Sequence, residues 1–400
     1  MKILQISNRV PYPLNEGGNI GIYNYTRGFY EAGCDVTLLA LQPKKHKTEQ
    51  EEAEGELSKY ARFKSFPINT DVKVVPALLN LFTTKSYNVE RFYDKKFDKY
   101  LAEHLKSNHY DVVQIEGTYP AIYTETVRKN CSSVIALRQH NVEYQIWERL
   151  AHNASNPLKK WYFSLLAKRL ESFEKRHLNI YDALVPVTPD DGDLFKQMGC
   201  NIPIFPSPAG IDMTVWKANM SSNPSFLYHI GSLEWMPNYE AVDWFLTNIW
   251  PALKKNYPKL EFFVAGKRMP EEMANRKIEG VHMLGEVPSA PDFIFDKGIC
   301  VVPLLSGSGI RLKILEAMSA GKLVISSTIG AQGIDYTAGE NLFIADSLED
   351  YLEVFEQMEQ NPDLMPQIQS AGQKLISKQY SNASVIDRLL AFYRSLTAKN

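Results

Sequence analysis

Short apolar runs alternate with long amphipathic segments along the whole chain, and this alternation constrains the fold more than any other feature. Apolar runs separated by segments of helix length are typical of strand–helix–strand units, whose strands pair in parallel. The chain is therefore predicted to be an α/β protein with Rossmann-like, doubly wound parallel sheets. The runs expected to be strands are residues 2–7, 35–41, 111–116, 133–138, 183–188 and 202–206 in the first half, and 226–230, 260–265, 281–284, 299–304, 323–326 and 342–345 in the second.

The length of 400 residues exceeds what one hydrophobic core usually organises, so we expect two such domains. Pro206 and Pro208 interrupt regular structure between the halves, which predicts a first domain at residues 1–212 and a second at 213–382. The last segment, 383–400, carries an apolar stripe at helical spacing. We expect it to form a helix that packs back on the first domain.

The net charge of -2 and the pI near 6.5 provide no overall basic field, which argues against nucleic acid as a partner. The four cysteines stand far apart without a CxxC or Cys/His pairing, so we expect neither a disulfide framework nor a metal site. The first apolar run is too short for an export signal, and no run reaches the ~20 residues of a membrane span. A cytoplasmic protein is the expectation.

A predicted helix over residues 156–177 is the candidate for membrane contact, because its stretch 159–169 mixes lysines with aromatic residues. This composition is typical of a helix that lies on a membrane surface, and would place the protein peripherally at the inner face of the cell membrane. The alternative is a helix that packs only on its own domain. The sequence leaves both open.

A glycine-rich turn after a predicted strand carries the clearest chemical signal. Gly307 and Gly309 let backbone N–H groups approach an anion closely, and Ser308 and Ile310 complete the turn. A helix predicted to begin near Arg311 adds the partial positive charge of its N-terminus. A pyrophosphate is the ligand that fits these features.

Arg311 and Lys313 place cations in the first turn of this helix, where they oppose the helix dipole unless an anion is bound. That local conflict itself indicates a ligand. Glu316, in the next turn, can accept the hydroxyl groups of a ribose if the helix begins as predicted. The alternative interpretation is a solvated helix start with an ion pair between Lys313 and Glu316.

Ala317, Met318 and Gly321 follow Glu316 before the next predicted strand. With them, the chain resembles the retaining GT-B glycosyltransferases of family four, the glycosyl transferases group 1. The resemblance implies a GT-B fold and metal-independent transfer of a hexose-type sugar with retention of configuration. It implies a nucleotide diphosphate sugar as donor, either a UDP or a GDP sugar, and no cofactor. It assigns Glu316 to the ribose of the donor nucleotide.

The sequence departs from the family pattern at three donor-binding positions. A first glutamate of the family motif, near the transferred sugar, is replaced here by Ser308. The family also holds the diphosphate with an arginine and a lysine six residues later, and those positions are Ser232 and Asn238. The departures put the identity of the sugar in doubt and remove both expected cations.

We predict that Arg311 and Lys313 supply the missing charge, with help from Lys267, because a leaving diphosphate needs fixed cations when no metal is used. Gly231 is expected to form the donor-side turn before Ser232. A Trp-x-Pro-Asn turn in residues 235–238 resembles a subgroup that builds polysaccharides.

In the first domain, Gly17 and Gly18 precede a predicted helix and are assigned to the donor, although a plain turn is the alternative. Glu116 and His140 follow adjacent predicted strands, at the edge where parallel sheets build their sites. The resemblance supports His140 and Glu143 as lining the acceptor cleft. Glu116 stands where the family often has a histidine that faces the donor sugar, and we predict that Glu116 takes that role and is catalytic together with His140. A structural role for His140 is the alternative.

The predicted function is transfer of a sugar to a saccharide or lipid-linked saccharide in the assembly of a surface polysaccharide or glycan. One alternative is a sugar-nucleotide epimerase of the same fold, which needs several acid–base residues around the sugar. Another is a non-catalytic sugar-binding relative. The donor base, the sugar, the acceptor and the linkage are not determined by the sequence.

Overall fold

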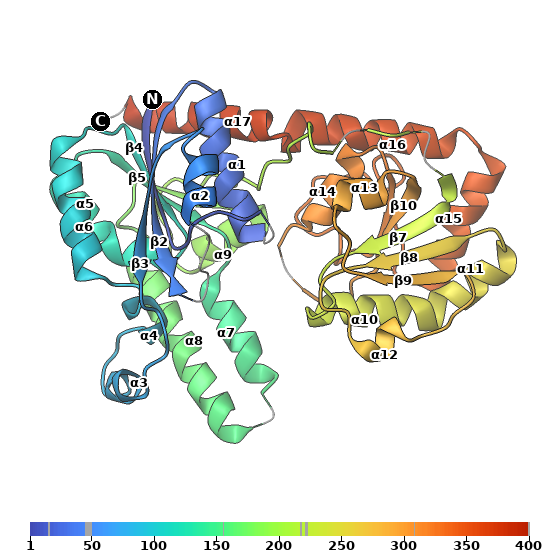
Figure 1. Cartoon of the computed structure of the whole chain (residues 1–400), viewed down its shortest axis with the longest axis horizontal. Helices are drawn as coiled ribbons and strands as arrows, with labels where there is room; N and C mark the ends of the chain where they lie inside the picture. The colour runs from blue at the N-terminus through green and yellow to red at the C-terminus, as the bar shows by residue number, and fades with distance from the viewer. Residues whose placement is uncertain are drawn as a thin grey trace. The chain divides into compact units, whose positions relative to one another are not determined.

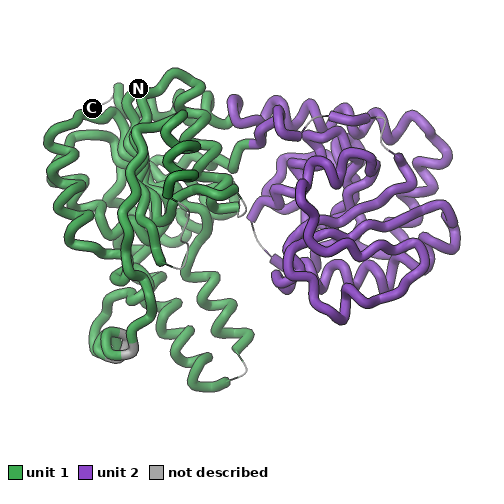
Figure 2. Tube along the Cα trace, in the orientation of Figure 1, with its two compact units in different colours: residues 1–210, 385–400 green, residues 211–384 purple. Residues whose placement is uncertain are grey.

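The structure is a computed structural model that describes residues 1–14, 17–44, 50–154, 156–216, 218–220, 223–307 and 309–398. It divides into two compact units, which we call unit 1 (Met1–Gly210 with Val385–Asn400) and unit 2 (Ile211–Ser384) (Figure 2). The first division lies two residues before the expected boundary at 212, and the second lies two residues after 382.

Unit 1 contains a six-stranded sheet in the order β3-β2-β1-β4-β5-β6, in which all neighbouring strands are parallel. The central strands are buried along nearly their whole length because helices cover both faces (Figure 1). The strands are β1 (Lys2–Ser7), β2 (Asp35–Pro43), β3 (Arg62–Ile68), β4 (Val112–Glu116), β5 (Val134–Gln139) and β6 (Ala183–Pro186).

Two helices of unit 1, α7 and the longer α8, form an antiparallel hairpin that extends from the sheet (Figure 1). The helices are α1 (Gly17–Glu31), α2 (Gln50–Leu57), α3 (Val74–Asn80), α4 (Tyr87–Glu90), α5 (Lys95–Ser107), η2 (Pro120–Tyr123), α6 (Thr124–Asn130), α7 (Glu143–His152), α8 (Pro157–His177), α9 (Pro189–Gln197) and α17 (Asn382–Thr397).

Helix α17 returns to unit 1 at the end of the chain. Its apolar stripe, which includes Leu389 and Tyr393, is buried in one cluster with Ile3 of β1 and Tyr25 of α1. The Tyr393 hydroxyl donates a hydrogen bond to Oε1 of Gln114 at 2.6 Å. Helix α17 therefore packs on unit 1.

Unit 2 contains a second six-stranded sheet in the order β12-β11-β10-β7-β8-β9, again with parallel neighbours. The strands are β7 (Asn223–Ile230), β8 (Glu261–Ala265), β9 (Val281–Gly285), β10 (Lys297–Val302), β11 (Leu323–Ser326) and β12 (Phe343–Ile344). The helices are α10 (Met236–Trp244), η3 (Phe245–Ile249), α11 (Trp250–Asn256), α12 (Glu271–Ala274), α13 (Ala290–Ile294), α14 (Leu312–Ser319), α15 (Leu348–Gln360), α16 (Leu364–Leu375) and η4 (Ile376–Tyr380).

Both sheets are doubly wound, so each has a point where the strand order reverses. The reversal lies between β1 and β4 in unit 1 and between β7 and β10 in unit 2. Loops that leave the carboxyl ends of two such strands diverge and open a crevice, which is where ligands bind in open α/β sheets.

The structure corrects the strand prediction at two places. Residues 62–68 form β3, an edge strand whose alternating exposed side chains, such as Arg62 and Lys64, gave no apolar run. The predicted strand at 202–206 is reduced to a single bridge between Leu184 and Ile204. Prolines have no N–H to donate to a sheet, and two of the five residues in 202–206 are prolines.

Within the described part of the chain, none of the helices combines the length and the hydrophobicity that a bilayer crossing requires.

Candidate functional site

The crevice of unit 2 is formed by the loop after β7 and the loop between β10 and α14. Gly231 immediately follows β7, and α14 begins at Leu312, one residue after the predicted start at Arg311. Asn238 lies in the first turn of α10. The structure therefore brings most of the predicted donor-binding residues of unit 2 to the reversal point between β7 and β10.

Lys313 reaches from α14 across to the β7 loop. Its ammonium nitrogen lies 2.9 Å from Oδ1 of Asn238 and 3.1 Å from Nε2 of His229. A Cβ atom placed on Gly231 would lie 2.6 Å from the same nitrogen, so only glycine leaves room for the ammonium there. Lys313 thus places its charge beside Asn238, the position where the family resemblance leads us to expect a lysine.

His229 is fully buried, and its neutral imidazole accepts a hydrogen bond from Lys313. Its Nδ1 lies 2.9 Å from the carbonyl oxygen of Val301, so Nδ1–H donates there and the lone pair of Nε2 faces the ammonium. Burial, with the nearby Lys313, holds the pKa of His229 well below its usual range. The imidazole therefore accepts a hydrogen bond from Lys313 without neutralising its charge.

Burial lowers the pKa of Lys313 to about 7, because the charged form loses solvation that its two contact partners, both uncharged, replace only in part. An anion at this point would favour the ammonium and raise that pKa. The crevice of unit 2 therefore favours an anionic ligand, which would stabilise the charged form of Lys313.

Arg311 stands at the start of α14 and contacts the glycine turn that precedes the helix. Its guanidinium donates a hydrogen bond from Nη1 to the carbonyl oxygen of Gly309 at 2.5 Å and stands 5.6 Å from the ring centre of Trp235. Gly307 has a φ of 124°, and a Cβ there would come within 2.6 Å of the guanidinium. The glycines of the turn therefore make room for Arg311, which is itself buried.

Glu316 lies one turn after Lys313 on α14 and is half-buried. Burial raises its pKa to about 7, and the charge of Lys313 partly opposes that rise. The predicted alternative, a simple ion pair between the two, is not the arrangement of Lys313, whose hydrogen bonds go to His229 and Asn238.

The remaining donor-side residues have different surroundings. Ser232 is exposed, and its carbonyl accepts a hydrogen bond from Asn238 at 2.8 Å. Ile310 is half-buried in the turn, and Ser308 lies outside the described residues. Lys267 does not join the cluster, because its ammonium pairs with Glu286 at 3.3 Å. Lys267 is exposed and can reach a nearby carboxylate. The sequence could not identify Glu286 as that partner.

The crevice of unit 1 lies where β1 and β4 separate, and Glu116 at the end of β4 is its centre. Oε2 of this fully buried carboxylate lies 3.1 Å from Nη1 of Arg138 and 2.8 Å from Nε2 of His140. Oε1 accepts hydrogen bonds from Gln5 at 3.1 Å and from Gln114 at 2.5 Å. The structure brings together the predicted pair Glu116 and His140 and adds Arg138 between them.

Burial would raise the pKa of Glu116, but the Arg138 guanidinium, together with His140 and Gln114, outweighs it and holds the pKa at about 2. Arg138 also stacks on the ring of Tyr25, 3.7 Å from the ring centre. Burial lowers the pKa of His140. The carboxylate is therefore ionised and paired, and is not suited to act as a general base at neutral pH.

Glu143 begins α7 and accepts a hydrogen bond from the Tyr119 hydroxyl at 2.9 Å. Burial raises its pKa. The backbone N–H of Glu143 donates to the buried Glu174 of α8 at 3.1 Å, and Thr118 donates to the same carboxylate at 3.0 Å. Glu174 thus caps the start of α7 and fixes Glu143, although burial raises the pKa of Glu174 to about 7.

Gly17 and Gly18 are the first two residues of α1, which follows the β1 loop. A Cβ on Gly18 would stand 4.0 Å from the guanidinium of Arg9, so a basic group lies near this helix start. The predicted glycines are therefore at the reversal point of unit 1.

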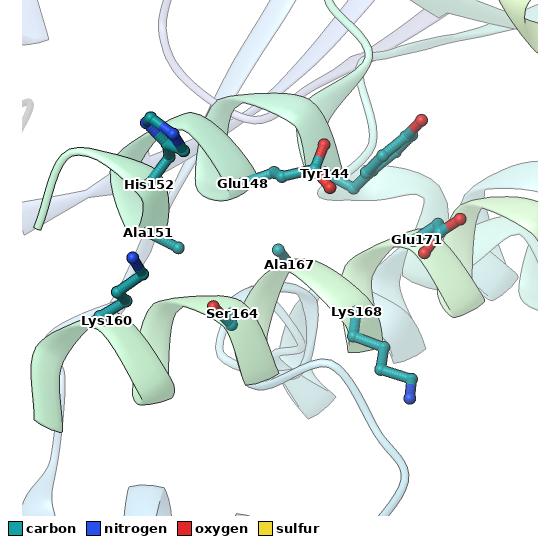
Figure 3. A pocket seen from close by; sticks show the side chains of 9 residues that line it. All are labelled: Tyr144, Glu148, Ala151, His152, Lys160, Ser164, Ala167, Lys168 and Glu171. Carbon is teal, nitrogen blue, oxygen red and sulfur yellow. The ribbon is translucent and has the colours of Figure 1, made fainter. Parts of the chain in front are cut away.

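A groove of about 400 Å³ runs between α7 and α8 (Figure 3). Its walls carry charges of both signs, from Glu148 and Glu171 and from Lys160 and Lys168. Figure 3 shows the small side chains of Ala151 and Ala167 at its floor. The groove lies outside both crevices, on the hairpin that Glu143 begins.

The sequence reasoning assigned no role to three residues that organise these crevices: His229, Arg138 and Glu174. A usable signal exists for the first two, since each is a polar residue at the carboxyl end of an apolar strand. Glu174 lies in the middle of a long amphipathic helix and gave no such signal. In the described parts of the chain, no group of three or more His, Cys, Asp and Glu residues is arranged to hold a metal ion.

The family model described as Glycosyl transferases group 1 matches residues 224–361, which lie within unit 2. The resemblance predicted from the sequence is confirmed there. A protein of Klebsiella pneumoniae named "Uncharacterized 44.6 kDa protein in cps region" is 24% identical over 371 residues, covering 86% of this chain and 87% of the relative.

Solved structures show the same fold at low sequence identity. HepE from Anabaena, solved in complex with UDP, has a TM-score of 0.68 and 12% identity, with 99% of this chain and 100% of that chain covered. Sucrose-phosphate synthase from Thermosynechococcus elongatus has a TM-score of 0.67 and 13% identity, with 100% of both chains covered. These likenesses confirm the predicted fold class, GT-B with two Rossmann-like units.

Proposed function

We propose, on the premise that residues 224–361 match the Glycosyl transferases group 1 family, that this chain is a retaining glycosyltransferase. It transfers a hexose-type sugar from a nucleotide diphosphate sugar to a saccharide or lipid-linked saccharide. Retention of configuration rests on the family resemblance. The observation that carries the donor assignment is the position of the Lys313 ammonium beside Gly231 and Asn238.

The donor diphosphate binds the crevice of unit 2. Arg311 contacts the turn that contains Gly307 and Gly309, and Lys313 lies beside Gly231. Backbone N–H groups of a glycine turn add further donors to an anion. Binding of the diphosphate protonates Lys313 fully, since the anion raises its pKa from about 7. Glu316 accepts the ribose hydroxyls.

Catalysis rests on stabilisation of the leaving nucleoside diphosphate. As the bond between sugar and phosphate breaks, negative charge grows on the phosphate oxygens, and fixed cations in a partly buried crevice stabilise it without reorganisation. Each such contact contributes about 3 kcal/mol to the transition state. Lys313 and Arg311 take the place of a divalent metal in this scheme, so we propose that transfer is metal-independent.

The acceptor binds unit 1, where Glu143, Tyr119 and His140 stand at or beside the crevice of β1 and β4. Glu116 and Arg138 hold His140 and give the crevice wall a fixed shape, and act as positioning residues. A cytoplasmic location at the inner face of the membrane and a role in surface polysaccharide assembly complete the proposal. The K. pneumoniae relative, named for a cps region, is in keeping with that role.

Thermal unfolding in the presence of UDP, GDP, ADP and their sugars, with and without magnesium, tests the proposal. One nucleoside diphosphate at 100 times its Kd is expected to raise the Tm by several degrees, since it adds about 2.7 kcal/mol to the folded state. Magnesium is expected to change that shift little. No shift with any nucleotide would contradict the donor assignment, and turnover of the sugar nucleotide without acceptor would favour an epimerase.

A further inference from the structure

A second cavity of unit 1, of about 280 Å³, lies where the end of α8 meets α4, η2 and the start of α6. We call it the α4–α8 pocket. It shares no lining residue with the groove of Figure 3, and Glu116, His140 and Glu143 of the unit 1 crevice do not line it. Its volume lies near the lower limit for small-molecule sites, which suits a ligand about the size of a sugar ring.

Helix α8 separates this pocket from the groove. Phe173, Arg176 and His177 have the spacing i, i+3 and i+4, so they lie on one face of the helix and line the pocket together. Phe173 follows the groove residue Glu171 by two positions, which is about 200° around the helix. The pocket and the groove therefore lie on opposite faces of α8.

Ser86, the residue before α4, carries a buried hydroxyl at the wall of the pocket. Ser86 is 2% exposed, its hydroxyl does not cap α4, and the hydroxyl has no hydrogen-bond partner among the residues that the structure describes. Buried polar groups are nearly always hydrogen-bonded, so this one needs a partner that the described chain does not supply. Because no hydrogen bond holds the hydroxyl, rotation about χ1 can turn it toward a ligand. None of the residues that line the groove, all of which are described, has such a group.

His177 adds a hydrogen-bond acceptor to the pocket. Its Nδ1 lies 2.7 Å from the carbonyl oxygen of Phe173, so Nδ1–H donates there and Nε2 keeps its lone pair. Burial lowers the pKa of His177, which keeps the imidazole neutral at pH 7. The imidazole stacks on Phe173 with 3.9 Å between the ring centres, and Ile122 extends this apolar wall. The pocket thus combines an apolar wall with a hydroxyl and an acceptor nitrogen.

The charged side chains that line the pocket balance one another. Lys85 and Arg176 contribute two positive charges, and Glu90 and Glu125 contribute two negative charges. Lys85 pairs with Glu90 at 3.3 Å. The carboxylates would repel a phosphate, and the lysine and arginine would repel a metal cation. The pocket therefore favours an uncharged ligand that both donates and accepts hydrogen bonds.

We propose that the α4–α8 pocket binds one uncharged sugar unit of a saccharide. A sugar ring presents C–H groups on its faces, which pack on the wall of Phe173 and Ile122, and hydroxyl groups at its edge. One hydroxyl donates a hydrogen bond to Nε2 of His177, and another pairs with Oγ of Ser86. The charged side chains bond the remaining hydroxyls. The pocket is a binding site beyond the proposed transfer reaction, because neither the donor nor the catalytic residues take part in it.

Titration of the full-length protein with glucose, galactose, mannose and N-acetylglucosamine, followed by saturation-transfer NMR, tests the proposal. At least one of the four sugars is expected to bind, and inorganic phosphate is expected not to compete with it. Because the ligand is uncharged, added salt should change its Kd less than about twofold.

Ser86→Ala should raise the Kd of that sugar roughly fivefold, because one hydrogen bond is lost. The Tm of this variant should stay the same or rise, since the hydroxyl that it removes is buried without a partner. Ser164→Ala is the matched control, because that exposed serine lines the groove on the other face of α8, and it should change the Kd less than about twofold. His177→Phe keeps an aromatic ring against Phe173 but removes Nε2, and should also raise the Kd roughly fivefold.

Absence of binding by all four sugars, or displacement of the bound sugar by phosphate, would overturn the proposal. An unchanged Kd in Ser86→Ala would also overturn it, because water would then account for the Ser86 hydroxyl. An equal loss of affinity in Ser164→Ala would place the sugar in the groove instead. Lys313→Met should bind the sugar like the wild type, and Ser86→Ala should keep the wild-type Tm shift with nucleotide. Failure of this proposal is therefore distinguishable from failure of the donor assignment.

Discussion

The two crevices stand at equivalent points of two similar sheets, but their buried cations have different partners. In unit 1, the buried Arg138 is paired with Glu116 at 3.1 Å, and the carboxylate is further bonded by two glutamines. In unit 2, Lys313 is held by the uncharged His229 and Asn238, and burial lowers its pKa to about 7. The first crevice is neutralised by its own residues, and the second carries a cation that an anionic ligand would stabilise.

This difference indicates which crevice is built for stability and which for a charged ligand. A buried charge that is paired with an opposite charge supports folding, and breaking the pair lowers the free energy of unfolding. A buried cation held only by neutral groups lowers the free energy of unfolding, and an anionic ligand compensates for that loss. Removing the cation should therefore damage folding in unit 1 and ligand binding in unit 2.

The largest expected effect is on stability in unit 1. Arg138→Met leaves the Glu116 carboxylate buried without its cation, and should lower the free energy of unfolding by about 3–5 kcal/mol. Denaturant unfolding followed by circular dichroism measures it. Arg128→Met is the control, since its pair with Asp182 is half-exposed and its loss should cost less than about 1 kcal/mol. An equal loss in Lys313→Met would remove the contrast between the units.

The next effect is on turnover in unit 2. Lys313→Met should lose about 2–4 kcal/mol of transition-state stabilisation, seen as a lower kcat/KM for sugar transfer, because the leaving diphosphate loses a cation. Its free energy of unfolding should stay the same or rise. Lys267→Met is the control, because that lysine pairs with Glu286 away from the cluster, and its kcat/KM should change less than about threefold.

Nucleotide affinity should depend on pH with an optimum near 7. Lys313, with a pKa of about 7 in the free protein, gains affinity for the diphosphate only when protonated, so its contribution is complete below pH 7 and is lost above it. Glu316, with a pKa raised to about 7, accepts ribose hydroxyls best when ionised, so its contribution is lost below pH 7. Affinity should fall up to about tenfold per pH unit on either side. A flat profile from pH 6 to 8 measured by calorimetry would be inconsistent with both roles.

The smallest effect concerns His229 as a positioning residue. His229→Phe removes the acceptor of the Lys313 ammonium and should reduce kcat/KM roughly tenfold, the equivalent of about 1.5 kcal/mol for a hydrogen bond to a charged group. It should also lower the pKa of Lys313, so the fall of kcat/KM at high pH should begin at lower pH. A purely structural role would reduce activity without moving that part of the profile.

Most of the fold could be predicted because buried parallel strands are continuous apolar runs, as in β4 and β10. The edge strand β3 could not, since exposed positions such as Arg62 and Lys64 interrupt its apolar pattern. Residues 202–206 have an apolar pattern but two prolines, and no pattern of hydrophobicity reports a missing N–H.

The sequence predicted which residue types form the candidate site, but not which residues their side chains contact. Glycines and cations close together in sequence identified the turn before α14, including Arg311 and Lys313. His229 lies 84 residues from Lys313, and only the parallel pairing of β7 with β10 brings the two together. The ion pair of Lys267 with Glu286 could not be predicted either, because Glu286 belongs to a different loop.

Proton uptake on nucleotide binding tests most directly whether Lys313 becomes protonated when an anion binds beside it. At pH 8 the free Lys313 is largely neutral, so binding of UDP, or of whichever nucleoside diphosphate raises the Tm, should take up close to one proton. Calorimetry in buffers of different ionisation enthalpy measures that number. We predict uptake near one for the wild type and for Lys267→Met, and near zero for Lys313→Met. Equal uptake in the wild type and in Lys313→Met would contradict the account.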